Sequence, residues 1–256
     1  MTCKDECWWN YVIRTSYFLY SDIGNLFSHN TIHHVKAILA IETCVPEASV
    51  ALWVNGGCVF KQQFASDRNH NSMVFNAIEN LLGELGELKL DLVIVGTGPG
   101  SYSGTRIGIA VGQGVALAHN CPAVGLGSFA ATFFARQIAP SMAVGDARRG
   151  LYYISKINDV GEAAPVELMN HEEFEKKLIS AGNITLFTFD DPASFQLSDA
   201  LSQSVERVRP EAHYLIDTWQ DLSPTRRDAL IKLPLSPTYL RAPFTSKAKP
   251  GHPLLR

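Results

Sequence analysis

A glycine-rich stretch, residues 96–106, has the residue types and spacing best suited to chemistry. It reads Gly-Thr-Gly-Pro-Gly-Ser-Tyr-Ser-Gly-Thr-Arg and joins a short apolar run to a helical pattern. Glycine lets the backbone approach a ligand, Ser101 or Ser103 can cap the helix, and the free N–H groups there favour negative charge. The stretch therefore indicates an anion-binding loop, and a tight strand-to-helix turn without a ligand is the alternative.

Two familiar phosphate motifs do not fit this loop. A P-loop needs Gly-Lys-Ser/Thr, but no lysine lies between Lys89 and Lys156, and a dinucleotide fingerprint needs Gly or Ala where Ser103 stands. A basic turn at residues 146–150 is a second candidate for phosphate or a partner, with a solvated turn paired by local Asp–Arg contacts as the alternative. The candidate anion- or nucleotide-binding residues are Gly98, Gly100, Ser101, Gly104, Arg106, Asp146, Arg148 and Arg149.

Composition excludes several classes of protein. With 256 residues, 46% of them hydrophobic, the chain can bury its own core, and its net charge of −3 gives no broad attraction for phosphate backbones. The five cysteines are scattered without a Cys-x-x-Cys pair, which suits reduced thiols in a cytoplasm. The apolar runs are shorter than the ~20 residues that a membrane-spanning helix needs, so no membrane contact is expected.

The pattern along the chain predicts an α/β protein built twice on one plan. Apolar runs and Asn-Gly turn chemistry predict strands at 38–41, 48–54 and 58–65, an amphipathic helix over 74–85, a strand at 90–95 and a helix over 105–119. The second half begins in the same way, with strands at 142–144 and 151–157, a helix at 172–178 and a strand at 185–189. Each half has an acidic residue where its first strand ends, which suggests a duplicated lobe with a cleft between the copies.

The chain is accordingly divided into an irregular N-terminal extension and two lobes. Residues 1–36 have no sustained period, and we expect them to be disordered or not native to the protein. Residues 37–125 form the first α/β lobe with the Gly-Pro-Gly loop. Residues 126–256 form the second α/β lobe, and its proline-rich tail is expected to be loop.

The helix after the loop contains glycines at a spacing of four residues: Gly104, Gly108 and Gly112. With Gly114, the glycines at 108 and 112 cost about 3 kcal/mol relative to alanine in a helix interior. A cost of this size suggests that another backbone approaches closely. Packing within the same lobe and packing against another subunit both remain open.

Several segments together resemble the TsaB (YeaZ) family: residues 38–43, His70, and residues 98–108, 146–150 and 237–241. The resemblance covers about residues 37–241. It implies the two-lobed duplicated fold of the acetate-kinase, Hsp70 and actin (ASKHA) type. It also implies a non-catalytic partner of TsaD in forming threonylcarbamoyladenosine in tRNA, with a TsaE-type ATPase in a larger complex, indirect contact with tRNA and a homodimer when alone.

Differences from the family pattern limit what the resemblance implies about ligands. Glu42 stands where the family usually has Asp, Cys44 stands where it usually has Ser, and Pro46 removes one N–H donor. No cofactor is therefore expected, and ATP or ADP binding is the alternative. The metal-binding histidines of the catalytic sister subunit align with Ser128 and Thr132, which are weak ligands, so the resemblance implies no metal site.

The partner surface that the resemblance implies lies on two helices, which would line one exposed apolar patch. Its residues are Val74, Ile78, Leu81, Leu82, Leu85, Gly104, Ile107, Gly108, Val111, Gly112 and Val115. The competing hypothesis is an ATP-dependent small-molecule kinase of the same fold, with phosphate at residues 98–104. Such a kinase would lack an obvious catalytic base, and Glu42 is the acidic candidate on the first hairpin. His70 is interpreted as a structural or capping residue, because no partner acid or nucleophile is identifiable beside it.

Overall fold

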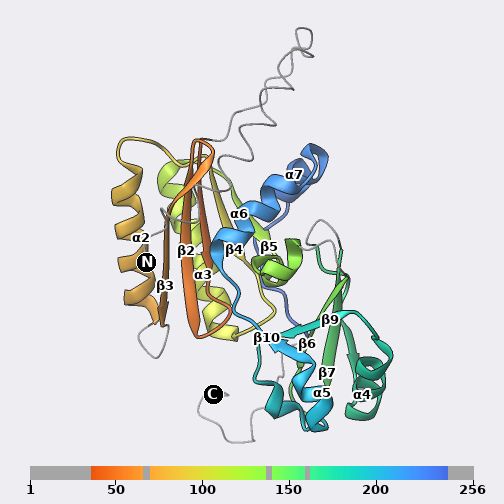
Figure 1. The fold of residues 1–256 in the computed structure, drawn as a ribbon. Coiled ribbons are helices and arrows are strands. Elements are labelled where there is room, and N and C mark those ends of the chain that lie inside the picture. Colours follow the sequence, from red (N-terminus) through yellow and green to blue (C-terminus); the bar gives the residue numbers. More distant parts are fainter. Residues whose placement is uncertain (1–35, 66–69, 137–139, 159–161, 242–256) are drawn as a thin grey trace, which may run out of the picture.

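Two five-stranded sheets form the core of the computed structural model (Figure 1). The structure describes residues 36–65, 70–136, 140–158 and 162–241. The predicted extension at residues 1–36 lies outside this part of the chain except for Lys36, and so does the tail after Arg241. Within the described residues, no helix is long and apolar enough to cross a membrane.

The first sheet has the strand order β3-β2-β1-β4-β5. Strands β1 (Ala37–Glu42), β2 (Glu47–Val54) and β3 (Gly57–Ala65) pair antiparallel, while β4 (Leu92–Gly96) and β5 (Ala123–Leu126) extend the sheet in parallel. Asn55 and Gly56 have positive φ in the β2–β3 turn, as the predicted Asn-Gly hairpin requires.

The second sheet repeats this plan with the order β10-β9-β6-β7-β8. Strands β6 (Ser141–Asp146), β7 (Tyr152–Ile157) and β8 (Glu167–Met169) pair antiparallel, and β9 (Thr185–Thr188) and β10 (Val205–Arg207) continue from β6 in parallel. Each strand thus has a counterpart in the first sheet, with β6 corresponding to β1. The predicted duplicated α/β fold of the ASKHA type is confirmed.

Helices cover both faces of the first sheet, since its strands alternate between two apolar clusters. Helices α2 (His70–Leu85) and α3 (Tyr102–His119) pack on the face that contains Leu39 and Val95. Helix α6 (Ala212–Asp221) packs on the opposite face against Ile38 and Ile94, and α7 (Pro224–Ile231) lies beside β5 (Figure 1). Both faces of β1 and β4 are therefore buried.

Helix α6 falls in the range predicted for the second lobe, but it covers the sheet of the first. Ala212, Leu215, Ile216 and Trp219 recur at the spacing of one helix face and fill the cluster around Ile38. This helix, α7 and the short strands β5, β8 and β10 were not predicted from the sequence. The apolar spacing within α6 is a signal that would have identified it.

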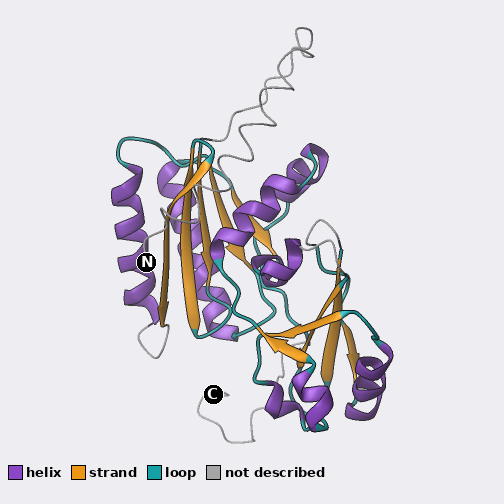
Figure 2. Ribbon diagram, viewed as in Figure 1, coloured by secondary structure: helices purple, strands orange, loops and turns teal. Residues whose placement is uncertain are grey.

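The second sheet is likewise covered on both faces (Figure 2). Helices α4 (His171–Ser180) and α5 (Asp199–Gln203) and the 3-10 turn η3 (Pro192–Phe195) lie over one face, where Phe174 and Phe195 are fully buried. The other face packs against Phe129 and Phe134 from the 3-10 turns η1 (Ser128–Ala131) and η2 (Phe133–Arg136), which follow β5. This aromatic cluster joins the second sheet to the segment that leaves the first.

The small-residue stripe of α3 packs within its own lobe. A Cβ at Gly104 would overlap the backbone oxygen of Thr43, one at Gly108 would overlap the Thr43 hydroxyl, and one at Gly112 would overlap Val95. The close approach is therefore that of Thr43, directly after β1, and of β4, so the stripe packs within its own lobe as one of the two alternatives predicted.

This packing separates the glycines of α3 by their effect on stability. Alanine at Gly114 meets no atom within 4 Å, so we expect Gly114→Ala to raise the free energy of unfolding by about 0.5–1 kcal/mol through helix propensity. Gly104→Ala should lower it by about 1–3 kcal/mol, because the new methyl group meets rigid backbone. Urea unfolding of both variants measures this, and equal shifts of the same sign would contradict the packing described.

Candidate interlobe site

A cavity of about 640 Å³ lies between the lobes. The first lobe contributes the β1–β2 turn and the glycine-rich loop, and the second contributes the turn after β6 and the chain after β9. The C-terminal segment, residues 237–241, lines the same cavity. Candidate segments that lie far apart in the sequence are thus brought together around one cavity.

The glycine-rich loop uses several of its N–H groups inside the protein. Gly98 N–H donates to the Ser128 hydroxyl at 2.9 Å, and Ser101 N–H donates to the Cys44 carbonyl at 2.6 Å. Gly104 N–H donates to Ser101 Oγ at 3.2 Å, so Ser101 is the helix N-cap that the sequence predicted as one of two candidates. These donors point to the chain itself and away from a ligand.

Close approach at this loop also involves the protein's own backbone. A Cβ at Gly100 would overlap the carbonyl of Cys44, as one at Gly104 would overlap that of Thr43. The glycines are required because the β1–β2 turn packs directly on the loop. The alternative predicted from the sequence, a tight strand-to-helix turn, accounts for both glycines without a ligand.

Glu42, at the end of β1, is a buried acid. Its side chain is 0% exposed and packs directly on Gly96, where any side chain would overlap it. The Cys44 N–H donates to Oε1 at 2.8 Å, whereas Oε2 has no hydrogen-bond partner among the described residues. Burial raises the pKa of Glu42 above its ordinary value, because loss of water disfavours the carboxylate. Glu42 does not line the cavity.

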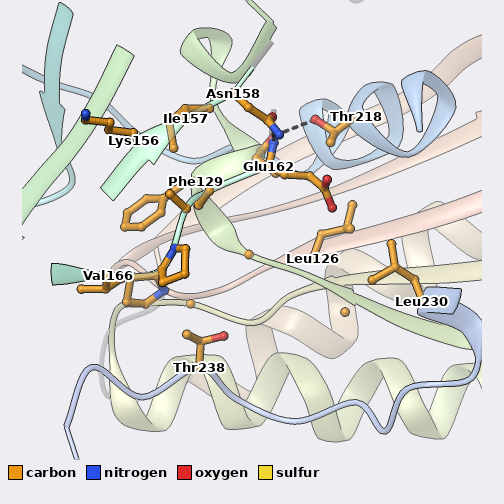
Figure 3. Close-up of a pocket in the computed structure, with 18 of the residues that line it drawn as sticks. Leu126, Phe129, Lys156, Ile157, Asn158, Glu162, Val166, Thr218, Leu230 and Thr238 are labelled. Carbon is orange, nitrogen blue, oxygen red and sulfur yellow. Dashed lines mark hydrogen bonds between the residues drawn. The ribbon is translucent and has the colours of Figure 1, made fainter. Parts of the chain in front are cut away.

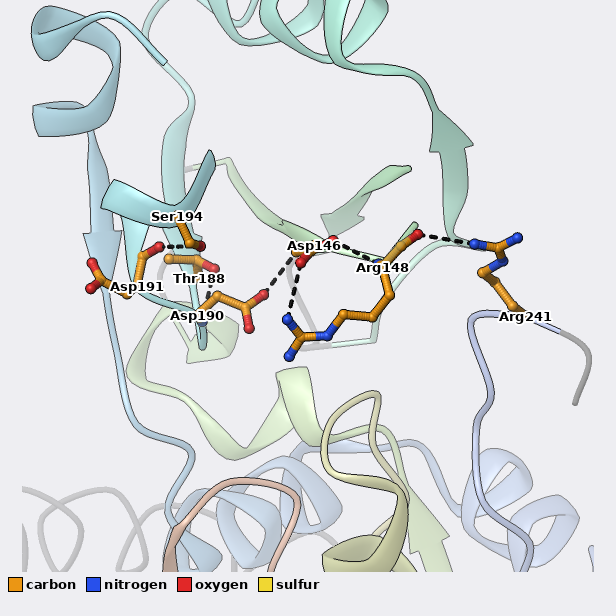
Figure 4. A network of polar contacts seen from close by, with 7 residues as sticks. All are labelled: Asp146, Arg148, Thr188, Asp190, Asp191, Ser194 and Arg241. Atoms are coloured by element: carbon orange, nitrogen blue, oxygen red, sulfur yellow. Dashed lines mark hydrogen bonds and ion pairs between the residues drawn. The ribbon is translucent and has the colours of Figure 1, made fainter. Parts of the chain in front are cut away.

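Asp146, the counterpart of Glu42 at the end of β6, is in a different environment (Figure 4). Its carboxylate accepts the Arg148 N–H at 2.6 Å and one Arg148 guanidinium N–H at 3.0 Å. Its own N–H donates to Asp190 Oδ2 at 3.0 Å, and burial raises the pKa of Asp190. Arg148 and Arg149 both have positive φ, which a non-glycine residue adopts only at a cost. The local Asp–Arg pairing that the sequence suggested is present in this turn.

An exposed cluster of aromatic and basic side chains borders the cavity. The Arg106 guanidinium carbon lies 3.8 Å from the centroid of the Tyr102 ring, and Arg106 Nε donates to the Tyr239 hydroxyl at 2.8 Å. The two tyrosine rings stack with centroids 5.8 Å apart. Arg106 therefore holds two rings from distant parts of the chain, and a phosphate would have to compete with them.

A second cavity, of about 600 Å³, lies beside the first (Figure 3). Leu126, Phe129 and Leu230 are among the apolar side chains that line it, and an ion pair of Arg226 Nε with Glu162 Oε1 at 2.6 Å lies at its edge. Pro99 and Thr238 line both cavities. The loop and the C-terminal segment therefore separate one cavity from the other.

The predicted partner residues of α2 and α3 belong mainly to the core of the first lobe. Besides Gly104, seven of the set are buried, contrary to the expected exposed patch: Val74, Ile78, Leu81, Leu85, Gly108, Val111 and Gly112. Leu82, Ile107 and Val115 pack against the core while partly buried. The same helices expose Met73, Phe75 and Leu117 on the side away from the sheet, with Leu117 at 84%. The apolar spacing identified the inner face of each helix.

Ser128 and Thr132, the positions aligned with metal-binding histidines, have structural roles. Ser128 accepts the Gly98 N–H, and Thr132 Oγ1 donates to the Phe129 carbonyl at 2.8 Å. Among the described residues, no group of three or more His, Cys, Asp or Glu residues is arranged to hold a metal ion. His70 begins α2, and its side chain lies outside the described part of the structure.

Comparison with known proteins identifies the family. The family model for "TsaD: tRNA N6-adenosine threonylcarbamoyltransferase" matches residues 61–197. The tRNA threonylcarbamoyladenosine biosynthesis protein TsaB of Haemophilus influenzae is 25% identical over 236 residues, which cover 84% of this chain and 97% of that protein. The chain belongs to this family, in its TsaB (YeaZ) branch. The Escherichia coli TsaB is 37% identical over 91 residues, covering 35% of this chain and 39% of that protein.

Solved structures of YeaZ share the fold. YeaZ from Pseudomonas aeruginosa has a TM-score of 0.60 and 21% identity, and a further structure described as similar to peptidase YeaZ from the same organism has 0.62 and 22%. Each match covers 80% of this chain and 100% of the other. The fold of this chain therefore includes the whole fold of these structures.

Sequence reasoning missed Asp190 and the contacts of Tyr239 and Arg241. Asp146 is the last residue of β6 and Asp190 comes just after β9, and acidic residues at the carboxyl ends of parallel neighbouring strands would have indicated their proximity. No local pattern reveals that Tyr239 reaches Arg106, since 133 positions separate them.

The buried Glu42 predicts a distinct dependence of stability on pH. An acid whose pKa is raised by folding stabilises the native state below its unfolded pKa, and that contribution is lost as pH rises from about 4.5 toward the raised value. We expect Glu42→Gln, which mimics the protonated acid, to unfold at higher denaturant than the parent at pH 8 and to converge with it near pH 4.5. Glu79→Gln, at an exposed position of α2, is the control. If the unfolding midpoints of Glu42→Gln and the parent differed by the same amount at every pH, the raised pKa of Glu42 would be contradicted.

Proposed function

We propose that this chain is the partner subunit of a TsaD-type catalytic subunit in the formation of threonylcarbamoyladenosine in tRNA, without catalytic residues of its own. The observation that carries the proposal is the match to a named TsaB protein along 97% of that protein's length. The match to the TsaD family model over residues 61–197 supports it, because two subunits of similar fold can pair in the way that subunits of a homodimer do.

The contacts of the interlobe cavity support a non-catalytic role. The acid at the end of β1 is buried away from the cavity, and the acid at the end of β6 is held by Arg148. Loop donors that would bind phosphate in a kinase, including Gly98 N–H and Ser101 N–H, bond to the chain itself. These observations favour the partner role over the ATP-dependent small-molecule kinase, and the proposal includes no bound nucleotide or other cofactor.

The outward faces of α2 and α3 are the proposed contact surface for the TsaD-type subunit. Phe75 is 58% exposed and Leu117 is 84% exposed, although large apolar side chains on a helix usually find cover. Met73, also on α2, is 38% exposed. The buried residues that the sequence predicted as partner contacts, such as Val74 and Ile78, position these helices through the core and need not touch the partner.

The finer details of assembly are part of the same proposal. In the absence of the TsaD-type subunit, the outward faces of α2 and α3 would pair in a homodimer, because an apolar surface tends to be covered. A TsaE-type ATPase would join a larger complex, and tRNA would be contacted mainly through the other subunits, consistent with a net charge of −3. We expect this assembly in the cytoplasm.

Light scattering of the chain alone and mixed with the TsaD-type subunit from the same source tests the proposal. We expect a mixed complex, and we expect Phe75→Glu and Leu117→Glu to weaken it by at least tenfold, because each would bury an unpaired charge at the contact. Ile179→Glu is the matched control, since Ile179 is 64% exposed on α4 of the other lobe.

Two outcomes would contradict this assignment. Absence of a complex at tens of micromolar for the parent chain would remove the partner role, and Mg²⁺-dependent ATP turnover by the chain alone would favour the kinase. Equal loss of binding in Ile179→Glu would instead place the contact elsewhere than α2 and α3.

A further inference from the structure

Residues 235–241, here called the C-terminal strap, follow α7 and α6 without helix or strand structure of their own. Leu235 packs against the apolar cluster under the first sheet, beside Gly125 of β5. Thr238 N–H then donates to the Thr97 carbonyl at 2.8 Å, directly after the end of β4. The first part of the strap is thus bound to the first lobe.

Tyr239 extends this attachment to the start of α3. Its hydroxyl accepts the Arg106 Nε–H at 2.8 Å, and its ring stacks on that of Tyr102. The ring is 41% exposed, so burial alone does not account for its position. Arg106 contacts both tyrosine rings and donates one hydrogen bond to Tyr239, so the strap is attached to α3 at Tyr239 as well as to the end of β4 at Thr238.

The next two residues contact the second lobe. Leu240 packs against the aromatic cluster that contains Ala147 and Tyr153. Arg241 Nη1 donates to the carbonyl of Arg148, in the turn after β6, at 3.0 Å (Figure 4). The strap therefore changes from one lobe to the other within the span from Tyr239 to Arg241.

We propose that the C-terminal strap fastens the two lobes to each other and so sets the angle between them. A residue spans at most about 3.6 Å of extended chain, so the short step from Tyr239 to Arg241 has little slack. Opening the cavity must therefore break a contact at one end of the strap. Two ion pairs, Arg209 with Glu47 at 3.6 Å and Arg226 with Glu162 at 2.6 Å, also join the lobes but do not line this cavity.

The Arg241–Arg148 contact is the weaker of the two attachments, so substitution of Arg241 is the more direct test of the strap. It is one exposed hydrogen bond beside the half-buried Leu240, whereas the first-lobe end combines a backbone bond, a tyrosine stack and an arginine with the packing of Leu235. The strap would release from the second lobe first and remain attached to the first. The inference concerns this chain alone and does not rest on the proposed partner.

Hydrogen exchange and small-angle X-ray scattering of the free chain test the fastening. In Arg241→Ala, we expect the amides of the 147–151 turn to exchange about fivefold faster, with Thr238 and α4 unchanged. The radius of gyration should increase as the lobes separate. Arg241→Lys retains a donor and should recover part of the protection, and Lys176→Ala, which removes an exposed cation from α4, is the matched control.

A second variant keeps the test independent of Arg241. Tyr239→Phe removes the hydroxyl and keeps the ring, so it should expose the Thr238 amide less than Tyr239→Ala does. Unchanged scattering and unchanged exchange in the 147–151 turn for both Arg241→Ala and Tyr239→Ala would overturn the proposal. Faster exchange confined to Thr238, with the radius of gyration of the parent, would also overturn it, since the strap would then be attached without fastening the lobes.

Discussion

Close packing of the β1–β2 turn on the glycine-rich loop is the constraint on which the interlobe region depends. The carbonyls of Thr43 and Cys44 occupy the space that side chains at Gly104 and Gly100 would need. This contact fixes where α3 starts, and α3 in turn presents Tyr102 and Arg106 to the C-terminal strap. A sterically determined turn thereby positions groups that lie more than a hundred residues away in the chain.

The duplicated plan places an acid at the end of the first strand of each sheet, yet the two acids have different surroundings. Glu42 is buried in the first lobe with one oxygen unpaired, while Asp146 is partly exposed and accepts two bonds from Arg148. Burial raises the pKa of Glu42 above its ordinary value, because loss of water disfavours the carboxylate. The same topology has therefore produced a buried position packed on Gly96 in one lobe and a partly exposed position paired with Arg148 in the other.

Local patterns predicted much of the fold. The apolar run at 48–54 before Asn-Gly and the helical spacing in 74–85 correspond to β2 and α2, and the acid-ended hairpins indicated the duplication. The site was harder to predict, because periodicity identifies the buried face of a helix. Val74 and Ile78, which the sequence predicted as partner residues, belong to the core. Phe75 and Leu117, which are exposed, are not part of the predicted set. Contacts such as Arg106 with Tyr239 depend on the tertiary path of the chain, which no local pattern contains.

The return of α6 to the first sheet bears on the order in which the protein is made. Ile38 and Ile94 belong to strands near the start of the chain, but the helix that covers them begins at Ala212, whose N–H also donates to Ser49 Oγ at 2.8 Å. On the ribosome, one face of the first sheet would stay uncovered while the whole second sheet is synthesised. An uncovered apolar sheet is prone to association, so this topology makes the nascent chain dependent on rapid completion of synthesis or on temporary protection by a chaperone.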